Sequence, residues 1–211
     1  GDSIGTGPEL SYPKGITLDS ANNRALVVDS DLNAVVAVDL ATGNRSILSD
    51  ASTGSGLGLS YPKGITLDSK NNRVLVVDSN LDAVIAVDLS TGDRSILSDL
   101  STGTGPELSS PEEITLDSAN NRALVVDLDL NAVVSVDLST GNRSIFTDDT
   151  TGTGLRFSQP KDITVDSERN HALIVDKALE AVFLVDLLSC DDDLNNNGFA
   201  DEGCDRVIIS R

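Results

Sequence analysis

A repeat of 49 residues constrains most strongly what this chain can fold into. The motif Pro-Lys-Gly-Ile-Thr-Leu-Asp occurs at residues 13–19 and 62–68, and variants of it occur at residues 111–117 and 160–166. Each copy therefore starts 49 residues after the one before it. Periods of about 20–50 residues are typical of solenoids, propellers and other arrays. Four copies of one unit account for the 211 residues.

Each unit contains four short runs with strand character, which in the first unit are residues 15–19, 24–29, 34–39 and 45–49. They are rich in Val and Ile and bounded by Asn, Asp, Gly and Ser, which favours strands over helices. The second and third runs are apolar on both faces, and this predicts sheets that are buried on both sides. The pattern predicts an all-β fold, a β-propeller of four four-stranded antiparallel blades. A right-handed β-solenoid is the alternative.

The repeat places the blades of a single propeller domain at about residues 8–50, 57–99, 106–148 and 155–211. The chain begins in a segment like an interblade linker and ends on a segment like a fourth strand, so we expect no strand exchange between its ends. Four blades closing alone, two chains pairing, and a piece of a longer parent chain are the three possibilities. An open arc would expose two apolar sheet faces, and such patches associate. Self-association or a longer parent chain is therefore favoured, and the absence of Met also indicates a processed chain or a piece of one.

Composition excludes several classes of partner. The chain carries 34 acidic and 15 basic residues, a net charge of -19. A surface this negative repels phosphate, so we expect no nucleic-acid partner. No apolar run approaches the roughly 18 residues that span a bilayer, so we expect no membrane insertion. Cations and basic partners are favoured.

The repeat unit resembles a known class of propeller. The segments Tyr12 to Asp19, Arg24 to Ser30, Ala34 to Asp39 and Gly43 to Arg45 share the frame P-x-G-I-x-x-D, V-x-D and V-x-D-x-x-T-G with the NHL-type repeat. The unit is also similar to the YWTD blades of the LDL receptor and to gluconolactonase-like propellers, although Leu26-Val27-Val28-Asp29 lacks the aromatic residue of the YWTD signature. The resemblance implies the propeller fold, which hosts many functions.

Three aspartates recur in every unit, at positions equivalent to Asp19, Asp29 and Asp39. Rings of acids that bind cations are one interpretation. The favoured one is that each carboxylate ends a strand and accepts backbone N–H bonds in the following turn, because a single active site does not need four copies. The lone His171 takes the place of Arg24, and we expect it to be a turn residue rather than a catalytic base.

Departures from the repeat cluster at the entry to the first strand. The Lys-Gly pair of the first two units becomes Glu-Glu in the third and Lys-Asp in the fourth. In a propeller the first strand lines the central channel, so these residues are expected near one mouth of it, as a polar pocket, a cation site or a neutral rim. The candidates are Lys14, Lys63, Glu112, Glu113, Lys161 and Asp162. Resemblance to the lactonases implies a divalent channel metal, but their E-G-P-x-W-like stretch is here Tyr12 to Gly15, without Glu or Trp.

The last unit carries an insertion of 14 residues between its third and fourth strands, bracketed by Cys190 and Cys204, the two cysteines of the chain. A disulfide between them would close the base of the loop and would indicate a secreted, periplasmic or cell-surface protein. A pair of free thiols is the alternative, and a zinc site is weaker because no His lies nearby.

Within the insertion, Asp193-x-Asn195-x-Asn197-Gly198 matches the first half of a calcium loop. Calcium needs 6–8 oxygen ligands, which alternate residues around a Gly turn can supply. The expected ligands are Asp193, Asn195, Asn197, the carbonyl of Phe199, Asp201 and Glu202. Cys204 occupies the place of the usual bidentate Glu. The segment resembles dockerin and thrombospondin type 3 loops, which implies a structural Ca²⁺; a solvated acidic loop is the alternative.

The sequence thus predicts an extracellular, non-enzymatic propeller that binds a protein, a glycan or its own copies. A metal-dependent, lactonase-like hydrolase with a cation near Glu112, Glu113 and Asp162 is one alternative. A structural filament or adhesin module, built by recent duplication, is the other.

Overall fold

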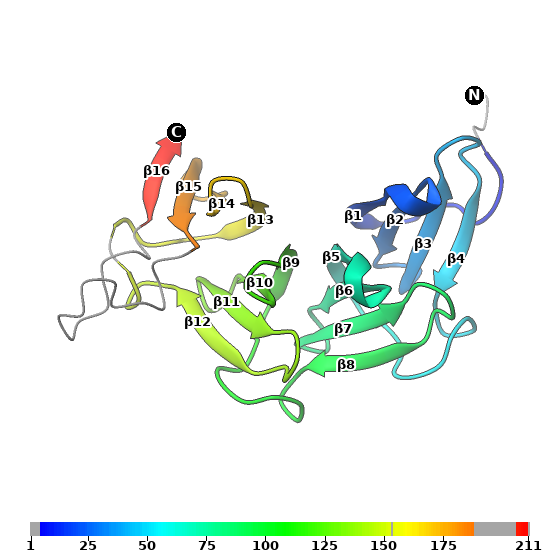
Figure 1. Ribbon diagram of the computed structural model, residues 1–211, viewed down its shortest axis with the longest axis horizontal. Coiled ribbons are helices and arrows are strands. Elements are labelled where there is room, and N and C mark those ends of the chain that lie inside the picture. The colour runs from blue at the N-terminus through cyan, green and yellow to red at the C-terminus, as the bar shows by residue number, and fades with distance from the viewer. Residues whose placement is uncertain (1–4, 153, 188–205, 211) are drawn as a thin grey trace. The chain divides into compact units, whose positions relative to one another are not determined.

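The computed structural model of the chain describes residues 5–152, 154–187 and 206–210. The chain forms two compact units, residues 1–102 and residues 103–211. Each unit contains two four-stranded antiparallel sheets whose strands follow chain order (Figure 1). Each sheet is therefore an up-and-down meander, and the sheets coincide with the 49-residue repeats. The predicted all-β architecture of four propeller blades is confirmed.

The strands of the first unit lie where the repeat predicts them. Blade 1 consists of β1 (Pro13–Asp19), β2 (Arg24–Asp29), β3 (Ala34–Asp39) and β4 (Arg45–Ser49). Blade 2 consists of β5 (Pro62–Asp68), β6 (Arg73–Asp78), β7 (Ala83–Asp88) and β8 (Arg94–Ser98). Short 3-10 turns, η1 (Ser20–Asn22) and η2 (Ser69–Asn71), join the first two strands of each blade.

The second unit repeats this order. Blade 3 consists of β9 (Pro111–Asp117), β10 (Arg122–Asp127), β11 (Ala132–Asp137) and β12 (Arg143–Thr147). Blade 4 consists of β13 (Pro160–Asp166), β14 (His171–Asp176), β15 (Ala181–Asp186) and β16 (Val207–Ser210). No helix within the described ranges has the length and apolar character required to cross a bilayer.

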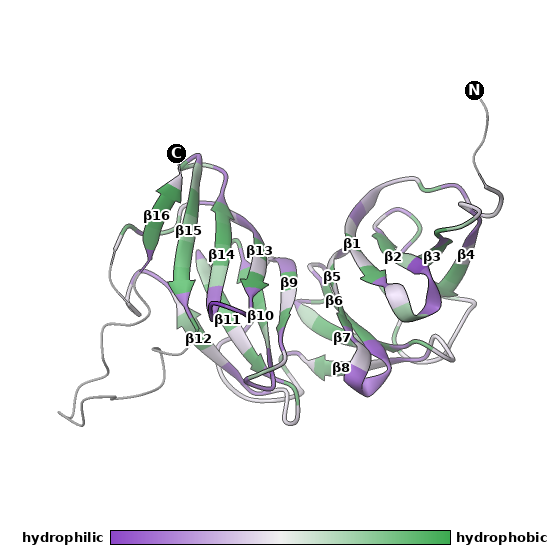
Figure 2. Ribbon diagram, turned by 45° about the horizontal axis from the view of Figure 1, so that its top comes forward, coloured by the Kyte–Doolittle hydropathy of each residue, from purple (hydrophilic) through white to green (hydrophobic). Residues whose placement is uncertain are grey.

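Adjacent blades of one unit pack face to face through their middle strands, which are the most hydrophobic parts of each sheet (Figure 2). In the first unit, Leu26 and Val28 of blade 1 join one buried cluster with Val74 and Val76 of blade 2. In the second unit, the corresponding cluster includes Phe157 and Phe183, whose rings meet edge to face at 5.0 Å. The middle strands of blades 1 to 3 are buried on both faces, as their sequence predicts, and one of these faces is covered by the neighbouring sheet of the same unit.

Blade 4 departs from this two-sided burial. Val175 is 44% exposed, whereas the equivalent Val28 and Val126 are fully buried. Leu173 and Leu184 of the same blade are only partly buried. One face of β14 and β15 is therefore partly open, although the sequence predicts burial of both faces.

The aspartate that ends each second strand organises the loops around it. In blade 1, Asp29 is fully buried, and its carboxylate accepts hydrogen bonds from the backbone N–H groups of Ser11, Tyr12, Asp31 and Leu32. Asp78, Asp127 and Asp176 are equally buried in the other blades and bind equivalent loops. These acids have the structural role favoured by the sequence.

The other two recurring aspartates also stabilise turns. Asp19 accepts a bond from the N–H of Asn22 and pairs with Arg24 at 2.8 Å. Asp39 accepts bonds from the N–H groups of Ala41 and Thr42. Hydrogen bonds from Thr42 lower the pKa of the Asp39 carboxyl below its usual 3.8, so this group is ionised at neutral pH. The turn interpretation holds for these positions as well.

An arginine at the start of the fourth strand ties each pair of blades together. In the first unit, Arg94 donates to the carbonyl oxygen of Leu57, to the hydroxyl of Ser49 and to the carbonyl oxygen of Thr53. Ser49 belongs to the preceding blade, so this side chain bridges the two sheets and the linker between them. Because Arg94 is 7% exposed, water does not compete effectively for these bonds.

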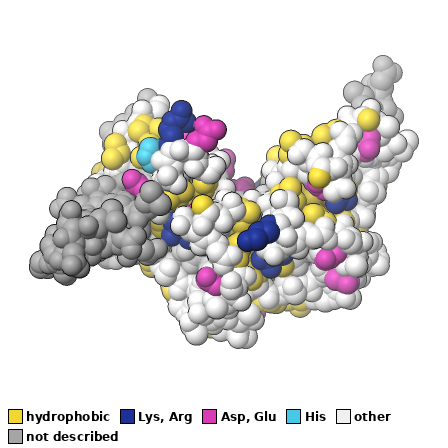
Figure 3. Space-filling view, viewed as in Figure 1, with side chains coloured by type: hydrophobic (Ala, Val, Ile, Leu, Met, Phe, Trp, Pro, Cys, Tyr) yellow, Lys and Arg dark blue, Asp and Glu magenta, His cyan; other side chains and the backbone are white. Residues whose placement is uncertain are grey.

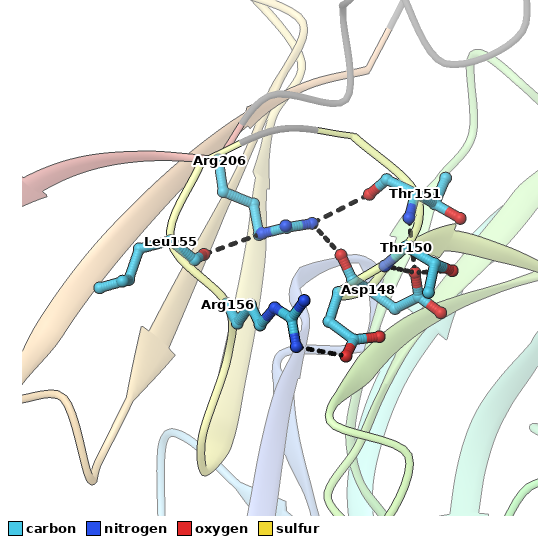
Figure 4. A network of polar contacts seen from close by, with 7 residues as sticks. Asp148, Thr150, Thr151, Leu155, Arg156 and Arg206 are labelled. Carbon is cyan, nitrogen blue, oxygen red and sulfur yellow. Dashed lines mark hydrogen bonds and ion pairs between the residues drawn. The ribbon is translucent and has the colours of Figure 1, made fainter.

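Arg206 makes the same bridge in the second unit (Figure 4). It donates to the carbonyl oxygen of Leu155 at 2.9 Å, to the hydroxyl of Thr147 at 2.7 Å and to the carbonyl oxygens of Asp148 and Thr151. The repeat of this contact shows that the arginine is part of the blade-to-blade interface.

Replacing Asp29 with Ala is expected to lower the free energy of unfolding by about 1–3 kcal/mol, because backbone donors in the loops would lose a buried acceptor. Asp31→Ala is the matched control, since Asp31 is exposed. Its cost should stay within about 0.5 kcal/mol. Urea unfolding measures both variants, and equal effects would contradict the organising role of Asp29.

Candidate functional site at the first-strand entry

The entry to each first strand contains an irregularity in the sheet. In blade 1 the pairing of β1 with β2 shifts register between Pro13 and Ile16, and β5, β9 and β13 show equivalent shifts. Such bulges redirect side chains away from the regular alternation. The residues within the shift in blade 1 are Lys14 and Gly15, which are the positions where the repeats differ.

Within the first unit, β1 and β5 lie close together at this point. A Cβ atom on Gly15 would lie 2.7 Å from the carbonyl oxygen of Lys63, which is closer than side chains tolerate. Gly15 therefore permits the two strands to approach. The approach brings Lys14 and Lys63, both predicted site residues, to the same end of the unit.

Two tyrosines complete this group, which we call the Tyr–Lys cluster: Tyr12, Lys14, Tyr61 and Lys63. The Lys14 ammonium lies 3.8 Å from the centre of the Tyr12 ring and 5.9 Å from that of Tyr61. The Lys63 ammonium lies 5.7 Å from the Tyr61 ring. A cation over an aromatic face is attracted by the ring quadrupole. Tyr12 is 46% exposed, so the cluster presents an amphipathic, cationic surface on an otherwise acidic protein.

Lys14 also changes the acidity of its neighbour. Its hydrogen bond and its positive charge lower the pKa of the Tyr12 phenol below the usual 10. The sequence analysis missed both tyrosines as site residues. The available signal was their spacing, because residues two apart on a strand share a face and each tyrosine precedes its lysine by two.

In the second unit the same positions have different chemistry. Lys161 forms an ion pair with Glu112 at 3.1 Å. Glu113 accepts a hydrogen bond from the N–H of Ile114, and Asp162 accepts one from the N–H of Ile163. The structure thus brings Glu112 and Lys161 together, whereas Glu113 and Asp162 each bond the backbone next to them.

This arrangement does not fit the channel metal that the lactonase resemblance implies. An ammonium group 3.1 Å from Glu112 opposes the approach of a cation to that carboxylate. Within residues 5–152, 154–187 and 206–210, no group of three or more His, Cys, Asp or Glu side chains is placed to hold a metal ion. The carboxylates at this entry therefore give no support to metal-assisted hydrolysis.

His171, at the start of β14, is partly buried. Its position holds an arginine in the first three blades, where Arg24, Arg73 and Arg122 each pair with an aspartate. In blade 4 the corresponding Asp166 pairs with Arg169 instead, at 2.7 Å. Blade 4 thus keeps an ion pair at this aspartate, with Arg169 as the cation.

The predicted disulfide and calcium ligands lie outside the described residues. These are Cys190 and Cys204 for the disulfide, and Asp193, Asn195, Asn197, Phe199, Asp201 and Glu202 for the metal. Both predictions therefore rest on the sequence.

Comparisons with known proteins support the fold. One chain in the crystal structure of a nidogen/laminin complex matches with a TM-score of 0.68 and 21% identity, over 85% of this chain and 61% of that chain. An auxiliary nutrient binding protein from Bacteroides thetaiotaomicron matches with a TM-score of 0.61 and 16% identity, over 80% of this chain and 46% of that chain. The chain is a β-propeller. It spans less than two thirds of either structure, and identities this low show the fold alone.

No family model matches the chain, and no curated protein matches it in sequence.

Replacing Lys14 with Ala is expected to raise the pKa of Tyr12 toward its usual value, because the charge and hydrogen bond that stabilise the phenolate are removed. The chain has only two tyrosines, so ultraviolet difference titration can resolve them, and Tyr12→Phe assigns the lower step. Lys70→Ala, in η2, is the control and should leave the titration unchanged. A lower step that persists in Lys14→Ala would contradict the pairing.

Proposed function

We propose that this chain is a non-catalytic, extracellular β-propeller module that binds other proteins and associates with further copies of itself. The nidogen/laminin complex, in which a protein of this fold is bound to another protein, supports the first part. We propose the Tyr–Lys cluster as a surface for acidic groups of a protein partner, since it combines exposed aromatic area with two cations.

The exposure of equivalent residues is the observation that carries the proposal of self-association. Ile65 in blade 2 and Ile163 in blade 4 are 4% and 5% exposed, and each lies in one buried cluster with residues of the blade before it in its unit. The equivalent Ile114 in blade 3 is 3% exposed. Ile16 occupies the equivalent position in blade 1, and its side chain is 67% exposed. Leu18 and Leu10, on the same part of blade 1, are also exposed. Blade 1 thus has a face built for contact with another blade.

Blade 4 carries the opposite face. Val175 and Ile209 are 44% and 53% exposed, whereas Val126 and Phe146 at the equivalent positions of blade 3 are buried. In Figure 3, hydrophobic side chains reach the surface over the β1–β2 part of blade 1 and over the β15–β16 part of blade 4. Exposed apolar patches of this kind mark interaction sites.

The surface that covers such a face elsewhere in the chain is another copy of the repeat. We therefore assign blade 4 of a second molecule as the partner of the blade 1 face. This contact is heterologous, so it generates a ring if the rotation closes and a filament if it does not. A filament would correspond to the filament or adhesin module that the sequence offers as an alternative.

We further propose that the insertion in blade 4 holds a structural Ca²⁺ and is closed by a disulfide between Cys190 and Cys204. The support is the alternating Asp and Asn pattern around Gly198 and the position of the cysteines at the two ends of the loop. A disulfide would be consistent with an oxidising, extracellular compartment.

Ile16→Asp is expected to weaken self-association at least about tenfold. Burying one isoleucine is worth about 1.5–3 kcal/mol, and 1.4 kcal/mol is a factor of ten in the equilibrium constant. Light scattering coupled to size-exclusion chromatography measures the mass as a function of protein concentration. Association should strengthen with salt, because the net charge of -19 makes the copies repel one another.

Leu100→Asp is the matched control, since Leu100 is 73% exposed and lies in a linker rather than on the end faces. This variant should associate like the unmodified protein. A monomeric mass at every protein and salt concentration would overturn the proposal of self-association.

Calcium is expected to raise the melting temperature of the protein, since a ligand that binds the native state stabilises it by mass action. Each kcal/mol gained corresponds to about 2–4 °C for a chain of this size. Asp193→Ala should abolish the rise, whereas Asp191→Ala, in the same loop but before the motif, should retain it. A melting temperature that is the same with calcium and with chelator would contradict the site.

A further inference from the structure

The fourth strand of every blade ends on a serine or threonine, and this hydroxyl has a defined partner where two blades of one unit meet. In the first unit, the Ser49 hydroxyl accepts a hydrogen bond from Nη1 of Arg94 at 2.6 Å and donates one to the carbonyl oxygen of Gly92 at 2.7 Å. Both partners belong to blade 2. Ser49 is fully buried. The hydroxyl of one blade is therefore enclosed by groups of the next, and we call this the arginine–hydroxyl contact.

The second unit contains the same contact between blades 3 and 4. Thr147 is fully buried, and its hydroxyl accepts a hydrogen bond from Nη1 of Arg206 at 2.7 Å. Another polar bond between blades is not repeated in this way. The Ser30 hydroxyl donates to the carbonyl oxygen of Pro62 in the first unit, whereas the residue equivalent to Ser30 in blade 3 is Leu128. The arginine–hydroxyl contact is thus common to the blade junctions of both units.

Blade 4 carries the hydroxyl of this contact at Ser210, where β16 ends. Ser210 pairs with Val182 of β15, as Ser49 pairs with Val35 of β3. The insertion between β15 and β16 has therefore left this hydroxyl in the register that it has in blade 1. Its surroundings differ, because Ser210 is exposed whereas Ser49 and Thr147 are fully buried.

Blade 1 carries the arginine of this contact at Arg45, where β4 begins. Nε of Arg45 donates to the carbonyl oxygen of Pro8 at 2.7 Å, as Nε of Arg94 donates to that of Leu57 at 2.8 Å. The two guanidinium groups are thus held by the same bond to the linker before their blade. Arg45 is only partly buried, whereas Arg94 is buried.

The bonds that an arginine makes to its own linker do not prevent the contact with another blade. Nη1 of Arg94 donates to the carbonyl oxygen of Thr53 in the linker and to the hydroxyl of Ser49 in the preceding blade. Nη1 of Arg206 likewise donates to Thr147 and to the carbonyl oxygen of Thr151. Arg45 can therefore keep its local bonds and still donate to a hydroxyl on a further blade.

We propose that Arg45 of one molecule donates to the Ser210 hydroxyl of a second molecule, and that this bond sets the register of the contact between blade 1 and blade 4. The inference rests on the self-association proposed above and adds the residues that align the two copies. Burial of apolar surface is non-directional, so the exposed faces alone do not determine how two sheets align. A hydrogen bond has a preferred distance and angle, and it supplies this information.

Changing Ser210 tests the contact, because this residue is exposed. Ser210→Lys is expected to weaken association at least about tenfold, since the hydroxyl acceptor is lost and an ammonium group faces the guanidinium of Arg45. Ser210→Asp should associate more tightly than Ser210→Lys. The net charge of -19 predicts the opposite order, because an added lysine reduces the repulsion between copies and an added aspartate increases it. Sedimentation equilibrium measures the association constants.

Ser95→Lys and Ser95→Asp are the matched controls, since Ser95 is an exposed serine on β8, the fourth strand of blade 2. These variants report the general effect of charge, so Ser95→Lys should associate at least as tightly as Ser95→Asp.

Mixing two variants tests whether the contact joins unlike ends of the molecule. Arg45→Ala retains Ser210, and Ser210→Lys retains Arg45. Each variant alone should stay monomeric at a concentration at which the unmodified protein associates, whereas an equal mixture should form pairs. If Arg45→Ala does not fold by circular dichroism, the Ser210 and Ser95 variants decide the question without it.

The outcomes separate this inference from the proposal on which it rests. Unmodified protein that is monomeric at every concentration would overturn both. Unmodified protein that associates, with Ser210→Lys equally strong or stronger than Ser210→Asp, would overturn the arginine–hydroxyl contact between copies and leave self-association standing. A mixture of the two folded variants that stays monomeric would also overturn this contact alone.

Discussion

The packing of one blade's apolar face on the next blade is the interaction on which the rest of the structure depends. A single four-stranded sheet with valines on both faces cannot bury both of them by itself. Leu26 of blade 1 and Val74 of blade 2 are both fully buried because each sheet covers the other. A chain made of such units has an uncovered face wherever the series of blades stops, and Ile16 lies on one of these faces.

The same packing explains the structural role of many of the acids. Blades that face each other need their loops to turn within a few residues, and backbone N–H groups in these turns need acceptors. Asp29, Asp39 and their equivalents supply these acceptors in each blade. Much of the negative charge is therefore a consequence of loop architecture. Function is better sought where the repeats differ.

The strands of this protein were predictable from sequence, whereas its surfaces were not. β2, β3 and β4 match the predicted runs, because β-branched residues between turn formers determine a strand locally. The pairing of Arg94 with Ser49 and the grouping of Tyr12 with Lys14 and Lys63 escaped prediction. The pairing of Arg94 with Ser49 depends on which blade packs on which and on the distance between them. The grouping of the tyrosine with the lysines depends on the sheet bulge at Lys14 and Gly15. Within each unit, predicted channel-entry residues lie together: Lys14 with Lys63 in the first and Glu112 with Lys161 in the second.

Blade 4 shows how a repeat changes when its neighbour changes. Leu184 pairs with Val207 where the other blades pair alanine or serine with serine, and His171 replaces an arginine that pairs with an aspartate there. Arg206 nevertheless keeps the bridge to the preceding blade. This contact between blade 4 and blade 3 has thus been retained, while the β15–β16 pairing and the position of His171 have diverged. Such limited divergence is expected if packing constrains the face of each blade that contacts the preceding blade. The remaining surface is then available for a separate role.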